Sequence, residues 1–217
     1  RMPSNLQYIA PETFRNCEQL KTFYIGKAFR GKINYGEEGD PDTLFLYYAP
    51  IRLIQIDKEN TSYQLQNEIL YTRDGHILCQ ALKNDNADSQ LTIPSCVTEI
   101  ADGAFYRNSE FGAIEVKGSL ERIGISAFAC ADVGSFYVKG GVNYLDRGSF
   151  YQSAISEWRC HGGVKKYEKS AFQDVDATNG YAIDMNAITK LYQELLYVNA
   201  TTDLSYWVKT IWNWITM

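Results

Sequence analysis

Histidine is scarce in this chain, and the residue patterns that mark a catalytic or metal centre are absent with it. The 217 residues include two histidines, His76 and His161, and neither belongs to a His-x-x-His or His-Glu-x-x-His pattern. The sequence also lacks a Cys-x-x-Cys pair, a glycine-rich phosphate loop and a nucleophile elbow. We therefore predict a protein that is not an enzyme and that holds no metal ion and no cofactor.

The cysteines do not form a disulfide framework. There are five, which is an odd number, and their spacing follows no known pattern: Cys17, Cys79, Cys96, Cys130 and Cys160. We expect the cysteines to act as small buried hydrophobic residues rather than as nucleophiles. Cys160 and His161 are neighbours on an expected strand, where they would point to opposite faces, so this pair predicts no catalytic dyad.

An excess of basic residues and long apolar runs are missing as well. The formal net charge is -5 and the pI is near 5.1, which argues against nucleic acid as a partner. No window approaches 18 uninterrupted apolar residues, so we expect no transmembrane segment. The aromatic content of 14% excludes a disordered chain of low hydrophobicity.

A short phrase recurs four times between residues 91 and 172. Each copy is apolar at its first and fourth positions, and a phenylalanine follows five residues after the fourth position. The copies are 97–100 with Phe105, 120–123 with Phe128, 142–145 with Phe150, and 164–167 with Phe172. The phenylalanines are 23, 22 and 22 residues apart, and such a constant period is typical of a solenoid. We predict coils of 22–23 residues that each place one ring in a common interior row.

A second segment in each coil alternates between buried and exposed positions. These segments are residues 114–116, 136–138 and 158–160. The alternation has the period of a strand with one buried face, so stacking of coils predicts a parallel sheet along the solenoid. Cys160 would then lie at the inward position of Val116 and Val138.

The N-terminal part follows the same pattern. Phe14 precedes Phe105 by 91 residues, and six other apolar or proline positions match at this offset. We interpret residues 32–42 as an insertion, expect Phe45 in the ring position of the next coil, and predict a β-hairpin around Asp74-Gly75. The cluster of Asp57, Glu59 and Asn60 favours turn capping over a calcium site.

These segments resemble the repeats of BspA-like leucine-rich repeat proteins. The resemblance rests on Leu-Thr-Ile-Pro-Ser-Cys-Val-Thr-Glu-Ile-Ala-Asp-Gly-Ala-Phe at 91–105, on Ile-x-Ile-Asp-x-x-Asn-x-x-Tyr from residue 54, and on Thr-Phe-Arg-Asn-Cys at 13–17. It implies a right-handed, β-rich α/β solenoid over residues 1–183, with insertions at about 32–42 and 57–90. It also implies a secreted or cell-surface protein of a host-associated bacterium that binds proteins or glycans. Because the chain opens at Arg1 inside a repeat, we expect a processed or truncated piece.

Residues 184–217 have a different pattern. Apolar residues at 188, 191, 192, 195 and 196 indicate one helix, and a second is expected from about 204 to 214 with three tryptophans. A helical cap over the last coil is our preferred interpretation. The alternative is a partner-binding or weakly self-associating surface, since clustered tryptophans are also typical of binding hot spots.

The outward positions of the expected sheet are the candidate binding residues. They are Tyr24, Gln55, Glu115, Lys117, Tyr137, Lys139, Glu157, Arg159 and His161. Glu115, Tyr137 and Arg159 should share one row. A second exposed row of Glu99, Arg122, Tyr144 and Lys166 has a similar composition. The favoured function is binding of a host or matrix protein or glycan at the cell surface, and the alternative is a structural spacer or self-association module.

Overall fold

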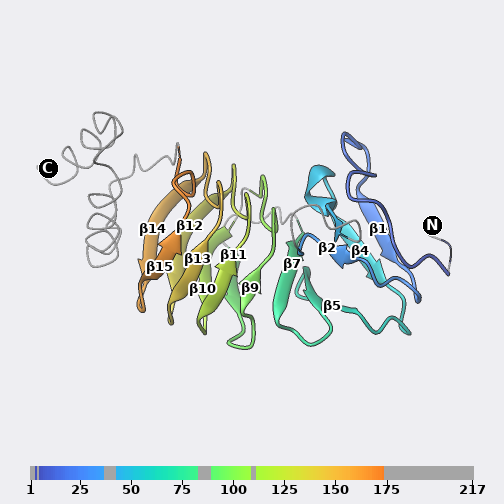
Figure 1. Cartoon of the computed structure of the whole chain (residues 1–217), viewed down its shortest axis with the longest axis horizontal. Helices are drawn as coiled ribbons and strands as arrows, with labels where there is room; N and C mark the ends of the chain where they lie inside the picture. Colours follow the sequence, from blue (N-terminus) through green and yellow to red (C-terminus); the bar gives the residue numbers. More distant parts are fainter. Residues whose placement is uncertain (1–2, 4, 37–42, 83–88, 109–110, 174–217) are drawn as a thin grey trace, which may run out of the picture.

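The computed structural model is an elongated β-solenoid whose coils stack along one axis (Figure 1). The structure describes residues 3, 5–36, 43–82, 89–108 and 111–173. Its elements are β1 (Thr22–Ile25), β2 (Lys32–Ile33), β3 (Thr43–Leu44), the 3-10 helix η1 (Leu46–Tyr48), β4 (Leu53–Ile56), β5 (Tyr63–Gln66), β6 (Ile69–Thr72), β7 (Ile77–Ala81), β8 (Ser89–Ile93), β9 (Glu99–Ile100), β10 (Phe111–Val116), β11 (Leu120–Ile123), β12 (Asp132–Val138), β13 (Val142–Leu145), β14 (Ala154–Cys160) and β15 (Val164–Tyr167).

Each coil of the main array contributes one strand to each of two sheets. The four-stranded sheet has the order β14-β12-β10-β8 and is parallel throughout. In the seven-stranded sheet, of order β15-β13-β11-β9-β7-β6-β5, the strands from β15 to β7 are parallel. The predicted parallel sheet is the four-stranded one. The recurring four-residue phrases contribute β9, β11, β13 and β15 to the second sheet.

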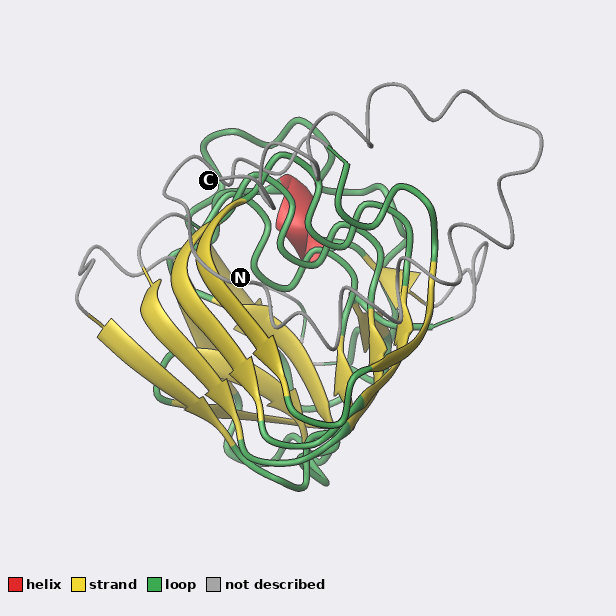
Figure 2. Cartoon of the chain, turned by 90° about the vertical axis from the view of Figure 1, so that its left-hand side faces the viewer, coloured by secondary structure: helices red, strands yellow, loops and turns green. Residues whose placement is uncertain are grey.

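A third row of hydrogen bonds joins the coils where no strand is present. The backbone N–H of Phe105 donates to the carbonyl of Ala127 at 2.7 Å, and that of Phe128 donates to Ser149 at the same distance. Two residues after each ring, Arg107, Cys130 and Gln152 adopt positive φ angles of 53°, 55° and 50°. Viewed along the solenoid, the two sheets form two sides of the coil, and loop segments close the third (Figure 2).

The predicted row of phenylalanines fills the interior. Adjacent rings of Phe105, Phe128, Phe150 and Phe172 stack nearly parallel, with centroids 4.6, 4.9 and 5.2 Å apart. Phe136 and Trp158 make a second stack at 4.9 Å on the inner side of the four-stranded sheet. The rings of the two stacks meet edge to face, an arrangement that stabilises aromatic pairs by about 0.5–1.5 kcal/mol beyond their burial.

The N-terminal region has a hydrophobic core of its own. Strands β1 and β4 pair in parallel, which aligns Phe23 with Ile54. The prediction for Phe45 was wrong: Leu46 is fully buried, whereas Phe45 is half-buried among other aromatic rings. Leu46 takes the buried position because η1 begins at this residue and turns the chain, which directs the Leu46 side chain inward.

The segments predicted as insertions contain strands. Lys32 and Ile33 form β2, which pairs in parallel with β3, while residues 37–42 lie outside the described residues. The predicted hairpin is present as the antiparallel pair β6–β7, and β5 adds a third strand to it. Strand β7 also pairs in parallel with β9, so the hairpin continues directly into the array.

The two cores are joined through a buried polar residue, Asn34. Its side-chain amide donates to the carbonyl of Cys79 and to Gln80 Oε1, and its Oδ1 accepts the backbone N–H of Leu46 at 2.7 Å. The carbonyl of Asn34 accepts the N–H of Asp102, in the first coil of the main array. The Asn34 side chain is fully buried, and its hydrogen bonds are made in a single orientation. Asn34 therefore determines how β2, η1 and β7 are positioned relative to one another.

Two predictions remain open. The predicted helices within 184–217, and with them the boundary at residue 183, lie outside the described residues. The right-handed winding also stays a prediction. Among the described residues there is no helix of sufficient length and apolar character to cross a membrane.

Candidate binding faces of the solenoid

The outward face of the four-stranded sheet carries the predicted row. Glu115 pairs in register with Tyr137, and Tyr137 pairs with Arg159, so the three residues stand on adjacent strands β10, β12 and β14. Thr92 on β8 continues the row on the other side of Glu115. Glu157 is aligned with Ser135 in the neighbouring row. The alternation of the sequence therefore predicted the alignment correctly.

The charges of this face are paired with one another. The Glu115 carboxylate contacts the ammonium of Lys117 at 2.5 Å and that of Lys139 at 3.4 Å. The hydrogen bond from Lys117 lowers the pKa of Glu115 below its ordinary value. Arg159 forms an ion pair with Glu157. These pairs are exposed, so each contributes little to stability, and their exposure leaves them available to a partner. His161 is exposed just after β14.

Tyr24 and Gln55 do not share this sheet. They align with each other on β1 and β4, which form a separate two-stranded sheet. Their placement in one ladder with the other candidates was therefore wrong, because β4 is followed by the β5–β7 meander rather than by another coil of the same sheet.

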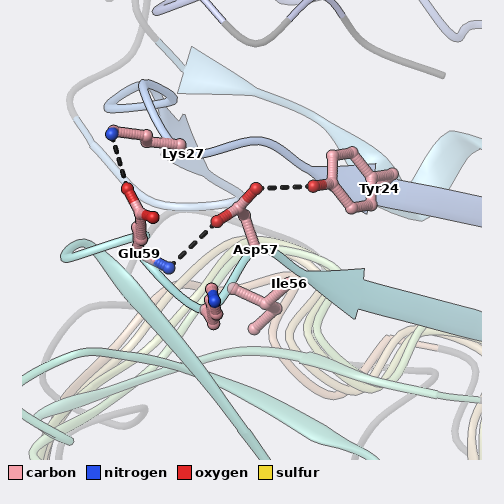
Figure 3. Close-up of a pocket in the computed structure, with 6 residues that line it drawn as sticks. Tyr24, Lys27, Ile56, Asp57 and Glu59 are labelled. Atoms are coloured by element: carbon pink, nitrogen blue, oxygen red, sulfur yellow. Dashed lines mark hydrogen bonds and ion pairs between the residues drawn. The ribbon is translucent and has the colours of Figure 1, made fainter.

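Tyr24 borders a shallow, open depression at the end of this small sheet (Figure 3). Its hydroxyl donates to Asp57 Oδ2 at 2.7 Å, and Lys27 contacts Glu59 at 2.5 Å. Asp57 Oδ1 accepts the backbone N–H of Glu59, and this bond together with Tyr24 lowers the pKa of Asp57. Asn60 Oδ1 likewise accepts the N–H groups of Ser62 and Tyr63. The cluster caps turns, as the sequence predicted.

The second exposed row contains the strongest ion-pair network of the described residues. Arg122 on β11 contacts Glu99 at 2.9 Å, Asp102 at 2.5 Å and Asp146 at 2.9 Å. Sequence reasoning placed Arg122 and Glu99 in one row. It missed the two aspartates because they follow the strands, where the alternation of strand residues no longer applies.

One guanidinium cannot neutralise three carboxylates. Burial raises the pKa of Glu99 and of Asp102, and the positive charge of Arg122 offsets only part of this effect. Burial acts to lower the pKa of Arg122, but Asp102 and Glu99 raise it above its ordinary value. The network is thus half-buried and carries an excess of negative charge, which suits a structural clamp between coils.

The same row continues to the last described coil. The Tyr144 hydroxyl donates to Glu168 at 2.7 Å, which raises the pKa of Tyr144 to about 12, and the Lys166 ammonium lies 5.1 Å from the ring centroid. Both contacts join β13 to the final coil. Charged and aromatic side chains of this row therefore hold neighbouring coils in register.

The remaining titratable groups do not assemble a reactive centre. Among the described residues no three His, Cys, Asp or Glu side chains are grouped as metal ligands would be. Cys79 and Cys160 are buried as predicted, and burial raises the pKa of the Cys79 thiol well above its ordinary value. Cys17 and Cys130 are half-buried, whereas Cys96 is exposed, so the prediction of burial was wrong for Cys96.

Stacked parallel strands, a repeated ring position and hydrogen-bonded turns define a leucine-rich-repeat solenoid. Residues 1–35 and 75–179 match six copies of the repeat described as BspA type Leucine rich repeat region. The chain belongs to this family, which is a repeat family rather than a catalytic one.

Two solved structures are similar to this chain. The pneumococcal vaccine antigen PcpA shares 17% identity at a TM-score of 0.57, over 76% of this chain and 50% of that one. A leucine-rich repeat protein from Eubacterium ventriosum ATCC 27560 shares 13% identity at a TM-score of 0.31, over 76% of this chain and 61% of that one. This chain therefore spans half the length of the PcpA structure. No curated protein matches it.

Proposed function

We propose that this chain is a non-enzymatic cell-surface module that binds a host or matrix protein or glycan through its repeat surface. The observation that carries the proposal is the row of Glu115, Tyr137 and Arg159 on adjacent parallel strands, in which Arg159 is exposed and the other two are half-buried. Tyrosine and arginine are enriched at binding hot spots, and the sheet fixes the backbone that carries them, so that only the side chains need ordering on binding.

The comparisons support a location at the cell surface. The structure of PcpA is named as that of a pneumococcal vaccine antigen, and its repeats share the fold of this chain. An extracellular location would also suit a module whose outward faces are rich in charged residues and tyrosine.

The test is binding of the purified chain to an array of host matrix proteins and glycans. A Tyr137→Ala/Arg159→Ala double variant should lose most of the binding, because it removes the aromatic and cationic members of the row. A Lys165→Ala/Lys169→Ala double variant is the matched control, since both lysines are exposed elsewhere on the last coil. Equal binding by the two variants, or no binding by the native chain, would contradict the proposal.

A structural spacer or self-association module is the second candidate. The pairing of Glu115 with Lys117 and Lys139, and of Arg159 with Glu157, favours it, because such a face balances its own charges without a partner. Self-association through residues 184–217 predicts that their removal abolishes an oligomer, whereas a cap predicts that the shortened chain becomes insoluble. Size-exclusion chromatography with light scattering separates these outcomes, and a soluble monomer would contradict both.

A further inference from the structure

A strip of three tyrosines ends in an arginine on each side. Arg15 lies 5.8 Å from the ring centroid of Tyr48, and the rings of Tyr48 and Tyr47 are 4.5 Å apart. The ring of Tyr47 is 5.9 Å from that of Tyr106, and Arg107 lies 5.1 Å from the Tyr106 centroid. We call these five residues the tyrosine–arginine strip. Phe45 supports it through a tilted contact with Tyr47 and an edge-to-face contact with Tyr48.

The strip is a fixed surface because it crosses the junction of the two cores. Tyr47 and Tyr48 belong to η1, and Tyr106 and Arg107 follow the first ring of the main array. The Tyr47 ring lies directly against Gly103, where a Cβ atom would come within 2.2 Å of it. Glycine at this position therefore lets the two halves of the strip approach each other.

The exposed charge of the strip is positive. Arg107 is exposed, and within the described part of the chain its guanidinium contacts the Tyr106 ring. Arg15 pairs with Glu12, but both side chains are more than half exposed, so that pair is weak. A guanidinium has five N–H donors, and a contact with the face of a ring uses none of them as a conventional hydrogen-bond donor.

This combination selects a particular chemistry. Tyrosine rings offer flat apolar surface beside a hydroxyl, which matches the apolar faces and hydroxyl groups of sugar rings. Guanidinium N–H pairs bind carboxylates in a bidentate geometry. We propose that the tyrosine–arginine strip binds an acidic oligosaccharide, with sugar rings against the tyrosines and carboxylates at the arginines.

An extended acidic peptide is disfavoured by the backbone of the strip. One mode of extended-peptide binding adds the peptide as a strand to free backbone groups at a sheet edge. Here the N–H of Tyr106 donates to Gly103 and the N–H of Arg107 donates to Ala129, so these two groups are not free for such pairing. Recognition by side chains suits a glycan, and binding of an acidic peptide through the arginines is the alternative outcome of the test. The site is separate from the sheet face of Glu115, Tyr137 and Arg159.

The test uses the full chain and an array of uronate- and sialate-bearing oligosaccharides, each printed beside its carboxyl-reduced form. The Arg107→Asn variant removes the guanidinium, and asparagine tolerates the left-handed backbone at this position. Tyr48→Ala removes one ring at the exposed end. Arg73→Gln is the control, because it removes an exposed arginine from the turn between β6 and β7, outside both candidate surfaces. Arg159→Gln is included to test the sheet face.

We expect the native chain to bind at least one acidic glycan and to bind its carboxyl-reduced form at least tenfold more weakly. Arg107→Asn should weaken binding roughly tenfold to a hundredfold, the usual effect of losing one hydrogen bond to a charged group. Tyr48→Ala should also weaken it, and Arg73→Gln should leave it unchanged. Binding lost in Arg159→Gln but kept in Arg107→Asn and Tyr48→Ala would support the sheet face and overturn the strip.

Two further outcomes would overturn the proposal. One is the absence of binding to any carboxylated glycan on the array. The other is Arg107-dependent binding to polyglutamate peptides without glycan binding, which would assign the strip to a protein partner. Circular dichroism of each variant establishes that a loss of binding is not a loss of folding.

Discussion

Phe128 is in contact with rings on both sides of its own coil. It stacks on Phe105 at 4.6 Å and on Phe150 at 4.9 Å, and Phe136 meets it edge-on at 5.0 Å. The side chain is fully buried. Neighbouring coils come close enough to hydrogen-bond because their interiors are filled by the same flat ring in the same orientation.

Substitution of Phe128 by alanine should lower the free energy of unfolding by about 3–5 kcal/mol, because the cavity would lie between two coils that cannot collapse onto it. Denaturation in urea measures this loss. Phe172→Ala is the matched control: its ring stacks on one phenylalanine and is only partly buried, so a smaller loss is expected. Equal losses, or an unchanged midpoint for Phe128→Ala, would show that the stack does not hold the array together.

The rows of charged side chains act between strands. Arg122 on β11 reaches Glu99 on β9 and also the aspartates that follow the strands of the coils on either side. It therefore ties three successive coils through one side chain. Its removal would leave carboxylates whose pKa values burial already raises.

Arg122→Gln should destabilise the chain by roughly 2–4 kcal/mol at pH 7, since breaking a buried ion pair leaves uncompensated charge. The deficit should shrink as the pH falls. A carboxyl whose pKa is higher in the folded state than its unfolded value of about 4 takes up a proton on folding, so acidification favours the folded state in that window. Without the positive charge of Arg122, the folded-state pKa values of Glu99 and Asp102 should rise further, so this pH window extends to higher pH.

Urea midpoints of the native chain and of Arg122→Gln between pH 7 and pH 5 measure this effect. Lys165→Gln, which removes an exposed cation from β15, two strands away in the same sheet, should show no comparable deficit. A deficit for Arg122→Gln that is constant across this range would mean that removal of Arg122 does not raise the pKa of Glu99 or Asp102 further.

Periodic features of the elements were predictable from the sequence, whereas features of the turns were not. The alternation on each strand placed Val116, Val138 and Cys160 inward, and the 22–23-residue period aligned the rings. The left-handed turn position is occupied by Arg107, Cys130 and Gln152, which share no chemistry, because the backbone of the adjacent coil imposes it. For the same reason the sequence did not indicate Asp102 or the contact between Tyr47 and Tyr106, which depend on how the turns pack.

At the scale of the whole molecule, two hydrophobic cores share the β6–β7 hairpin. Ile69, Tyr71 and Leu78 belong to the core of the main array, whereas Leu70 and Cys79 belong to the N-terminal core. Asn34 and the contact of Tyr47 with Gly103 add further links between the two regions. Unfolding of the two cores is therefore coupled through the hairpin and these links.

Gly103→Ala should lower stability by about 2–4 kcal/mol, through the positive φ of 58° and the overlap of the new Cβ with the Tyr47 ring. Because the overlap lies between the cores, we expect one unfolding transition to separate into two by calorimetry. Gly148→Ala is the control, with the same φ but its nearest neighbour at 3.4 Å. If Gly103→Ala and Gly148→Ala lost equal stability and each unfolded in a single transition, this would argue against an independent role for the junction.

The hydrogen bonds that join the coils run along the length of the molecule, while the strands lie across it (Figure 1). A force applied to one end of the array would therefore break these bonds one coil at a time rather than all together. Each coil that opened would replace a rise of about 5 Å with extended chain on the order of 75 Å long. A solenoid built in this way would lengthen in steps under load and absorb mechanical work while its remaining coils stayed folded.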